Sequence, residues 1–174
     1  MKEIGFYTKK VLEHFQKPHN FGKIKNPNAI GRAGNLVCGD VMQLYLKIVK
    51  DKKGREIIKD VSFETFGCVA AIATSSVITD LIKGKTLNRA LDFDRESIVK
   101  KLGGLPPIKL HCSVLAADAL YDAIYNYLRE QKREIPEKLK LVHKRIKSAQ
   151  KEIEKKYKDW VQIEREMYKK SSLP

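Results

Sequence analysis

The sequence predicts an α+β fold in which a β-hairpin is followed by several helices. Residues 41–50 and 56–66 alternate apolar and polar side chains, as half-buried strands do, and residues 51–54 form the turn between them. Residues 69–83 are apolar enough for a buried helix, and residues 112–131 place apolar side chains at helical spacing. A composition of 43% hydrophobic and 32% charged residues is that of a soluble globular protein, so these elements are expected to share a core.

The other elements follow from helical spacing and from residues that end helices. A first helix is expected until Pro18, because proline and the residue before it disfavour further helix. The segment after it is rich in Gly, Asn and Pro and is expected to be irregular. The predicted ranges are helix at 6–17, loop at 18–37, short helices at 86–91 and 94–102, and irregular chain at 103–107.

Pro136 marks the expected boundary between a domain over 1–135 and a helical extension over 136–174. Apolar residues of the extension recur at alternating steps of three and four, interrupted once by Lys156, which is a heptad pattern. This stripe either binds a partner or a second copy, or it packs back on its own domain, and the sequence leaves both open. The stripe consists of Leu139, Val142, Ile146, Ala149, Ile153, Trp160, Ile163 and Met167.

The net charge of +14 raises the possibility of nucleic-acid binding. The basic residues are spread over the whole chain, however, and no paired-cysteine zinc finger, RGG stretch or aromatic RNA-binding motif is present. Nucleic acid is therefore not the expected partner, whereas an acidic protein partner is compatible with the charge. No run of about 18 apolar residues and no secretory signal is present, so we expect a cytoplasmic protein without membrane contact.

The three cysteines, Cys38, Cys68 and Cys112, carry the chemistry. An odd number without a secretory signal argues against a disulfide framework. Each cysteine stands where one element gives way to another, rather than inside an apolar run where a core thiol is expected. Cys68 and Cys112 begin helices, where free backbone N–H groups and the helix dipole stabilise the thiolate. The thiolate is the form that binds metals and attacks sulfur.

Soft thiolate ligands select zinc, Cu(I) or iron–sulfur clusters. The cysteines are single and far apart, whereas structural zinc sites usually pair cysteines at short spacing. Asp40, close to Cys38, or His111, beside Cys112, could complete four ligands. A carboxylate in place of a thiolate should weaken the bond to iron, which suits a protein that gives its cluster away. Asp40 capping a turn and His111 as a plain loop residue remain the simpler alternatives.

Four segments resemble the IscU/NifU family of iron–sulfur cluster assembly scaffolds. They are CGDVM, GCVAAIATSS and LPPIKLHCS around the three cysteines, and YTKKVLEHFQKPHNFG near the N-terminus. The resemblance covers about residues 6–130. It implies a small antiparallel three-stranded sheet with helices packed on one face, to which this chain adds its C-terminal helical extension. The extension has no cysteine, so no second cluster is expected.

The resemblance implies a scaffold or carrier rather than an enzyme. Such a protein assembles a labile [2Fe–2S] cluster from iron and persulfide sulfur and transfers it to apo-acceptor proteins. Cys38, Cys68 and Cys112 would bind iron, with Asp40 as the fourth ligand or the residue governing release, and His111 as its alternative. Cys112 would accept the persulfide from a cysteine desulfurase. The alternative function is a zinc-bound sulfur-transfer protein, and zinc is also possible in the cluster-free form.

The resemblance further implies partners. Leu105, Pro106, Pro107, Ile108 and Lys109 form a segment similar to the one that a dedicated Hsp70-type chaperone recognises. Its minimum role is that of a rigid loop before the last core helix. Tyr7 matches a family tyrosine that could mediate a transient homodimer, and an electron donor such as a ferredoxin would reduce the persulfide. Two departures, Val69 after the middle cysteine and residues 35–37 before the first, are expected to alter cluster shielding. A hydrolase using Cys112 and His111 is disfavoured, because neighbouring residues rarely align as nucleophile and base.

Overall fold

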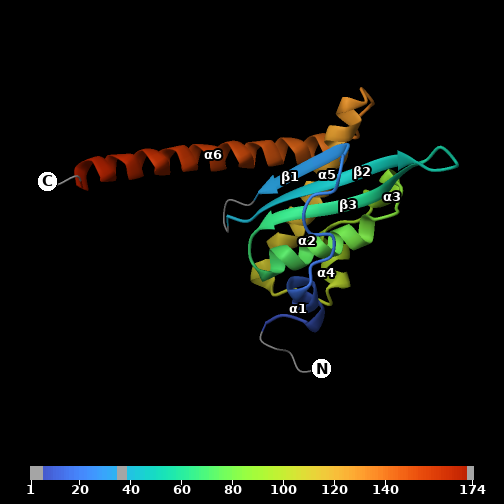
Figure 1. Ribbon diagram of the computed structural model, residues 1–174, viewed down its shortest axis with the longest axis horizontal. Coiled ribbons are helices and arrows are strands. Elements are labelled where there is room, and N and C mark those ends of the chain that lie inside the picture. Colours follow the sequence, from blue (N-terminus) through green and yellow to red (C-terminus); the bar gives the residue numbers. More distant parts are fainter. Residues whose placement is uncertain (1–5, 35–38, 172–174) are drawn as a thin grey trace.

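The computed structural model describes residues 6–34 and 39–171 (Figure 1). A three-stranded antiparallel sheet in the order β1-β2-β3 lies against helices, so the predicted α+β fold is confirmed. The strands are β1 (Ala29–Gly34), β2 (Val41–Lys50) and β3 (Glu56–Phe66). The helices are α1 (Lys9–Gln16), α2 (Val69–Ile82), α3 (Leu87–Ala90), α4 (Arg95–Lys101), α5 (Leu110–Glu130) and α6 (Glu137–Ser171), with a 3₁₀ turn, η1, at Pro107–Lys109.

The hairpin of β2 and β3 has the predicted bounds. Its register runs from Val41 opposite Phe66 to Lys50 opposite Glu56, with an irregularity at Lys47/Ile48. The apolar residues of β2 face the helices as the alternation predicted, and Leu44 and Leu46 are fully buried. On β3 the fully buried Phe63 continues this face. The hairpin therefore supplies one wall of the core, and α2 and α5 supply the other.

The predicted loop at 18–37 is wrong at 29–34, because these residues form the edge strand β1, which pairs with β2. The inward positions of β1 are small residues, Ala29, Gly31 and Ala33. They are small because α5 passes close to the strand: a Cβ on Gly31 would collide with the backbone of α5 at Ala119 and Ala123. Close helix packing therefore hides the usual β-branched signal of a strand.

The helices agree with their predicted ranges to within a few residues at most ends. Helix α1 begins at Lys9 rather than at residue 6, because the Thr8 hydroxyl caps it by accepting the Val11 N–H at 3.3 Å. The same hydroxyl donates to the Leu102 carbonyl at 2.6 Å, which ties α1 to the end of α4. Helix α5 begins two residues before Cys112, directly after η1. No described helix is long and apolar enough to cross a membrane.

The first turns of α6 pack back on the domain, against α5 and β1. Leu139 and Ile146 are buried there. Between them, the His143 ring stacks on Tyr125 at 3.8 Å and its Nδ1 lies 2.7 Å from the carboxylate of Asp122. The later part of α6 projects away from the sheet and the other helices (Figure 1). The side chains of the distal heptads, including Trp160, Ile163 and Met167, lie outside the described residues, so their partner-binding role stays a prediction, as does the division at Pro136.

Candidate functional site

Two of the three predicted cysteines meet at the ends of separate helices. Cys68 is the N-cap of α2, and Cys112 lies in the first turn of α5. Their Sγ atoms are 3.8 Å apart, with Cys112 buried and Cys68 half-buried. Both thiols therefore lie at a helix N-terminus. The predicted convergence of these helix starts is thus present in the structure.

Asp40 joins the two thiols from the start of β2. Its Oδ2 lies 3.6 Å from Cys112 Sγ and 3.8 Å from Cys68 Sγ, and the residue is only 4% exposed. A buried carboxylate needs hydrogen-bond, charge or metal partners, and its position beside two sulfur atoms makes Asp40 a ligand candidate. The structure therefore brings Asp40 into the predicted site.

Two glycines position Asp40. Gly39, immediately before it, has a φ of +72°, a conformation that glycine adopts most readily. Gly67 faces the carboxyl group: a Cβ at this position would lie 2.9 Å from Asp40 Cγ and 2.8 Å from Ala71 Cβ. Glycine at position 67 thus makes room for the carboxylate next to Cys68. Sequence reasoning missed this role, although a glycine directly before the N-cap of α2 was the signal available.

His111 lies beside the same group at the start of α5. Its ring can supply one nitrogen to a set with Asp40 and Cys112 in which all ligand atoms lie within 4.8 Å of one another. Its Nε2 is buried and has no hydrogen-bond partner among the described residues. Buried imidazole nitrogens are normally satisfied, so an unpartnered one next to a thiol and a carboxylate is a ligand candidate.

Cys38 lies outside the described residues, so its part in the site stays a prediction. It stands two residues before Asp40 in the chain. The third predicted ligand is therefore adjacent to the site in sequence.

Tyr7 and Leu105 pack against the apolar surroundings of the thiols, which include Ala70, Ala71 and Cys112. Partial burial, and next the negative charge of Cys68, raise the pKa of Tyr7. The charge of Cys68 also raises the pKa of Lys109, which places a stable positive charge beside the site. Tyr7 thus lies near the thiols. Its contact with a second copy of the chain stays a prediction.

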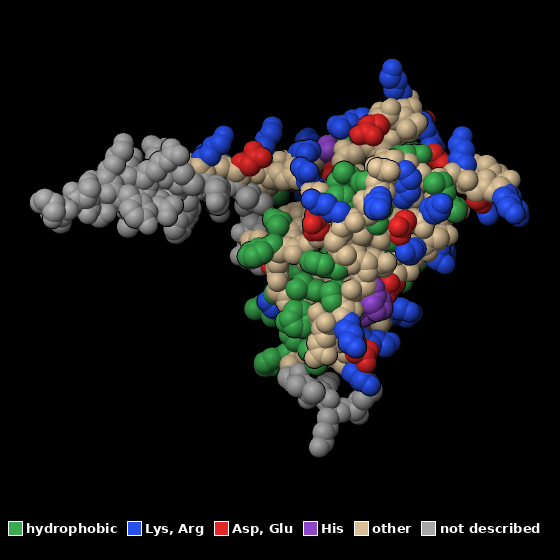
Figure 2. Space-filling model, in the orientation of Figure 1, with side chains coloured by type: hydrophobic (Ala, Val, Ile, Leu, Met, Phe, Trp, Pro, Cys, Tyr) green, Lys and Arg blue, Asp and Glu red, His purple; other side chains and the backbone are tan. Residues whose placement is uncertain are grey.

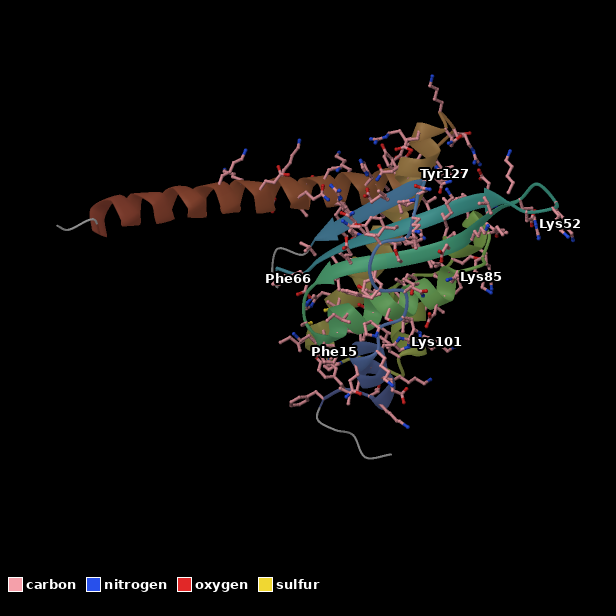
Figure 3. The ribbon with its side chains drawn as sticks, viewed as in Figure 1. Phe15, Lys52, Phe66, Lys85, Lys101 and Tyr127 are labelled. Carbon is pink, nitrogen blue, oxygen red and sulfur yellow. The ribbon has the colours of Figure 1, made fainter. Side chains whose placement is uncertain are left out.

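The loop before α5 has one apolar side chain directed at the thiols and another at the surface. Leu105 turns toward the thiols, whereas Ile108 is 78% exposed. Pro106 and Pro107 lie between Leu105 and Ile108, and Pro107 is the first residue of η1. Phe66, at the end of β3 that leads into α2, is 79% exposed (Figure 3). Figure 2 shows hydrophobic side chains gathered on this side of the molecule, whereas lysines and arginines are dispersed over the visible face.

Comparison with known proteins shows the family of this chain. Residues 6–134 match the family model of the NifU-like N-terminal domain. The chain is 52% identical over 124 residues to the iron-sulfur cluster assembly scaffold protein IscU 1 of Archaeoglobus fulgidus, covering 71% of this chain and 78% of that protein. It is 43% identical over 127 residues to the IscU scaffold of Aquifex aeolicus, covering 73% and 79%.

Among solved structures, the chain is similar to a putative iron-sulfur cluster assembly scaffold protein of the SUF system from Fervidobacterium islandicum. The TM-score is 0.53 at 25% identity, over 68% of this chain and 96% of that one. The family match ends close to Pro136, before the helical extension begins. The chain therefore belongs to the IscU/NifU family of iron–sulfur cluster assembly scaffold proteins.

Proposed function

We propose that this chain is a non-catalytic scaffold on which a labile [2Fe–2S] cluster is built from iron and persulfide sulfur and then passed to apo-acceptor proteins. The cluster is its cargo. Cys38, Cys68 and Cys112 are the proposed thiolate ligands, and Asp40 or His111 is the fourth. Family membership and the chemistry of this donor set support the proposal.

The observation that carries the proposal is the triangle formed by the two described thiols and the carboxylate. Its sides measure 3.8 Å between the sulfurs, and 3.6 and 3.8 Å from each sulfur to Asp40 Oδ2. Around one tetrahedral metal with bonds of about 2.3 Å to sulfur and 2.1 Å to oxygen, two sulfurs lie about 3.8 Å apart and sulfur and oxygen about 3.6 Å apart. The chain thus holds the three atoms near metal-binding separations.

The mixed donor set also supports release. A carboxylate oxygen is a harder ligand than a thiolate and holds iron less firmly than a fourth cysteine would. His111 lies within reach to replace it. An exchange between Asp40 and His111 would change the ligand on one iron without moving either helix. We therefore propose Asp40 as the residue that governs release, with His111 as its alternative.

Sulfur arrives by thiolate attack, for which Cys112 is the proposed nucleophile. The thiolate attacks the outer sulfur of a persulfide on a cysteine desulfurase, the donor's S–S bond breaks, and the donor cysteine leaves as thiolate. Two electrons from a donor such as a ferredoxin then cleave the new S–S bond, which releases sulfide and restores the Cys112 thiolate. Cys112 is buried, and Tyr7 and Leu105 pack against the cluster that contains it, so we propose that these side chains move to admit the donor.

Three kinds of partner fit the surface near the thiols. The exposed Ile108 in the 3₁₀ turn η1 offers an apolar side chain at the surface, which suits recognition by an Hsp70-type chaperone. The exposed Phe66 and the neighbouring apolar surface suit a docking desulfurase or acceptor. Tyr7 beside the thiols suits a transient homodimer that shares or shields a cluster.

Anaerobic reconstitution tests the scaffold function. The full chain is incubated with ferrous iron, cysteine and a cysteine desulfurase, and the visible spectrum, iron and sulfide are measured. We expect about two irons and two sulfides per bound cluster, lost when Cys38, Cys68 or Cys112 is replaced by serine. Replacement of Ser113, next to Cys112, by alanine is the matched control and should retain the cluster. A cluster that survives every single Cys→Ser change would refute the assignment.

A second candidate function, zinc-bound sulfur transfer, is favoured by one observation. The triangle fits a single tetrahedral ion, and the orphaned Nε2 of His111 belongs to a side chain that could supply the fourth ligand. Metal analysis of natively purified chain, with mass spectrometry for an added sulfur on each cysteine, separates the two functions. Tight zinc, a persulfide on Cys112 and no cluster after reconstitution would establish the sulfur carrier instead.

A further inference from the structure

Three metal-ligating side chains meet at the far end of α2 from the thiols. His14 lies in the last turn of α1, His19 follows Pro18, and Asp80 lies in the last turn of α2. One ligand atom from each lies within 4.8 Å of the other two. The imidazole rings of His14 and His19 are 4.8 Å apart between centroids, and His19 Nδ1 is 2.7 Å from Asp80 Oδ2.

These separations are close to those of a metal site. Two ligands bound at about 2.1 Å to one tetrahedral ion are about 3.4 Å apart. The His19–Asp80 pair must therefore open by about 0.7 Å, and the His14 nitrogen must approach by up to about 1.4 Å. The side chain of His19 is 56% exposed and that of Asp80 is 33% exposed. Rotation of these side chains at the surface supplies such movements, and water can complete the coordination.

Contacts with Ser76 hold the ring of His14 and the backbone of His19. Ser76 Oγ lies 2.8 Å from His14 Nδ1 and accepts the backbone N–H of His19, also at 2.8 Å. When His14 donates its Nδ1–H to this hydroxyl, its Nε2 keeps a free lone pair for a metal. Histidines that bind metals commonly donate their second ring N–H in this way. Asn20 supports the remaining ligand by approaching Asp80 Oδ1 at 3.4 Å.

A second histidine–aspartate pair in the chain shows what is different here. His143 Nδ1 lies 2.7 Å from Asp122 Oδ1, the same separation as in the His19–Asp80 pair. That pair is mostly buried, however, with side chains 13% and 3% exposed, and the His143 ring stacks on Tyr125. It belongs to no group of three potential ligands among the described residues. The His143–Asp122 pair joins α6 to α5. The His19–Asp80 pair, in contrast, lies beside a second imidazole and is accessible to solvent.

We propose that His14, His19 and Asp80 form a second, thiolate-free site for a divalent transition metal of the zinc class. Two imidazoles and one carboxylate are a donor set that binds Zn²⁺, Co²⁺, Ni²⁺ and Cu²⁺. Asp80 lies twelve residues beyond Cys68 along α2, so the two sites are about 18 Å apart at 1.5 Å per residue. Metal here joins α1 and the segment after it to α2, and it does so independently of the cluster ligands.

Cobalt titration of the full chain under anaerobic conditions tests the site. Thiolate-bound Co²⁺ shows sulfur-to-metal charge-transfer absorption, whereas a site of imidazoles and carboxylate shows only weak visible bands. We expect both signals in the unchanged chain. His14→Gln, His19→Gln and Asp80→Asn should each weaken binding at the second site at least tenfold, and Ser76→Ala should weaken it about tenfold. His143→Gln and Asp92→Asn are the matched controls and should leave it unchanged.

The charge-transfer band and the far-UV circular dichroism show whether each variant is folded. A second class of Co²⁺ that persists in His14→Gln, His19→Gln and Asp80→Asn would overturn the assignment. So would an unchanged chain that binds Co²⁺ only with thiolate absorption. If the thiolate band itself were absent while the weak bands remained and depended on His19, the second site would stand and the proposed function of the cysteines would fail. The two proposals therefore fail separately.

Discussion

Replacing Leu139 by alanine measures how firmly α6 is joined to the domain. Leu139 is 1% exposed and belongs to the main core cluster, whereas Leu141 on the same helix is 62% exposed. Leu→Ala changes at fully buried sites cost about 2–5 kcal/mol, made up of lost transfer free energy and a cavity. Because α6 can settle toward α5, we expect a loss of about 2–3 kcal/mol in unfolding free energy, in the lower part of that range.

The assay is urea unfolding monitored by far-UV circular dichroism, and the melting temperature is measured in a separate thermal scan. A loss of about 2–3 kcal/mol lowers the melting temperature by roughly 5–10 °C in a chain of this size. Leu141→Ala is the matched control, since it removes the same atoms from an exposed position, and it should change stability by less than about 0.5 kcal/mol.

Equal effects of the two substitutions would refute the packing of α6 on the domain. If Leu139→Ala instead produced a separate unfolding transition at lower urea concentration, α6 would detach before the rest of the domain unfolds. That outcome would make the extension a separate unit, as the predicted boundary at Pro136 implies. A single cooperative transition with the expected loss would make the first turns of α6 part of the core.

Three further predictions concern single positions. Gly67→Ala should displace the carboxylate of Asp40 and weaken Co²⁺ binding at the thiols at least tenfold, with circular dichroism unchanged; unaltered binding would contradict the role given to Gly67. Gly31→Ala should destabilise the chain by about 1–3 kcal/mol or more in urea unfolding, because its Cβ meets helix backbone that cannot rotate away; a neutral result would contradict the packing of β1. Asp94 caps α4, and the hydrogen bond from the backbone N–H of Ser97 holds the pKa of Asp94 below its ordinary value. Asp94→Ala should therefore lower the unfolding free energy by about 1 kcal/mol at neutral pH, and by less below about pH 4, where the carboxyl takes up its proton. Asp92→Ala is the exposed control.

Much of the fold could be predicted from local patterns. Alternation over 41–50 and 56–66 sets which side chains face the helices, and it holds in the structure because each strand has one buried face. The apolar run after Cys68 forms α2 as expected. The edge strand β1 was missed because its buried positions are alanine and glycine, and these are dictated by the distance to α5 rather than by strand propensity.

The sequence by itself predicted a candidate donor set of cysteine, aspartate and histidine at element boundaries, but it left a turn-cap role for Asp40 and a loop role for His111 open. Only the tertiary structure decided the distances: the triangle of Cys68, Cys112 and Asp40 depends on helix starts that packing brings together and on the space that Gly67 leaves. It also decided that the first turns of α6 pack on α5, since a heptad stripe does not encode what it contacts. The meeting of His14 and His19 with Asp80 likewise depends on the packing of α1 against α2, a contact between segments far apart in the chain that local sequence patterns do not specify.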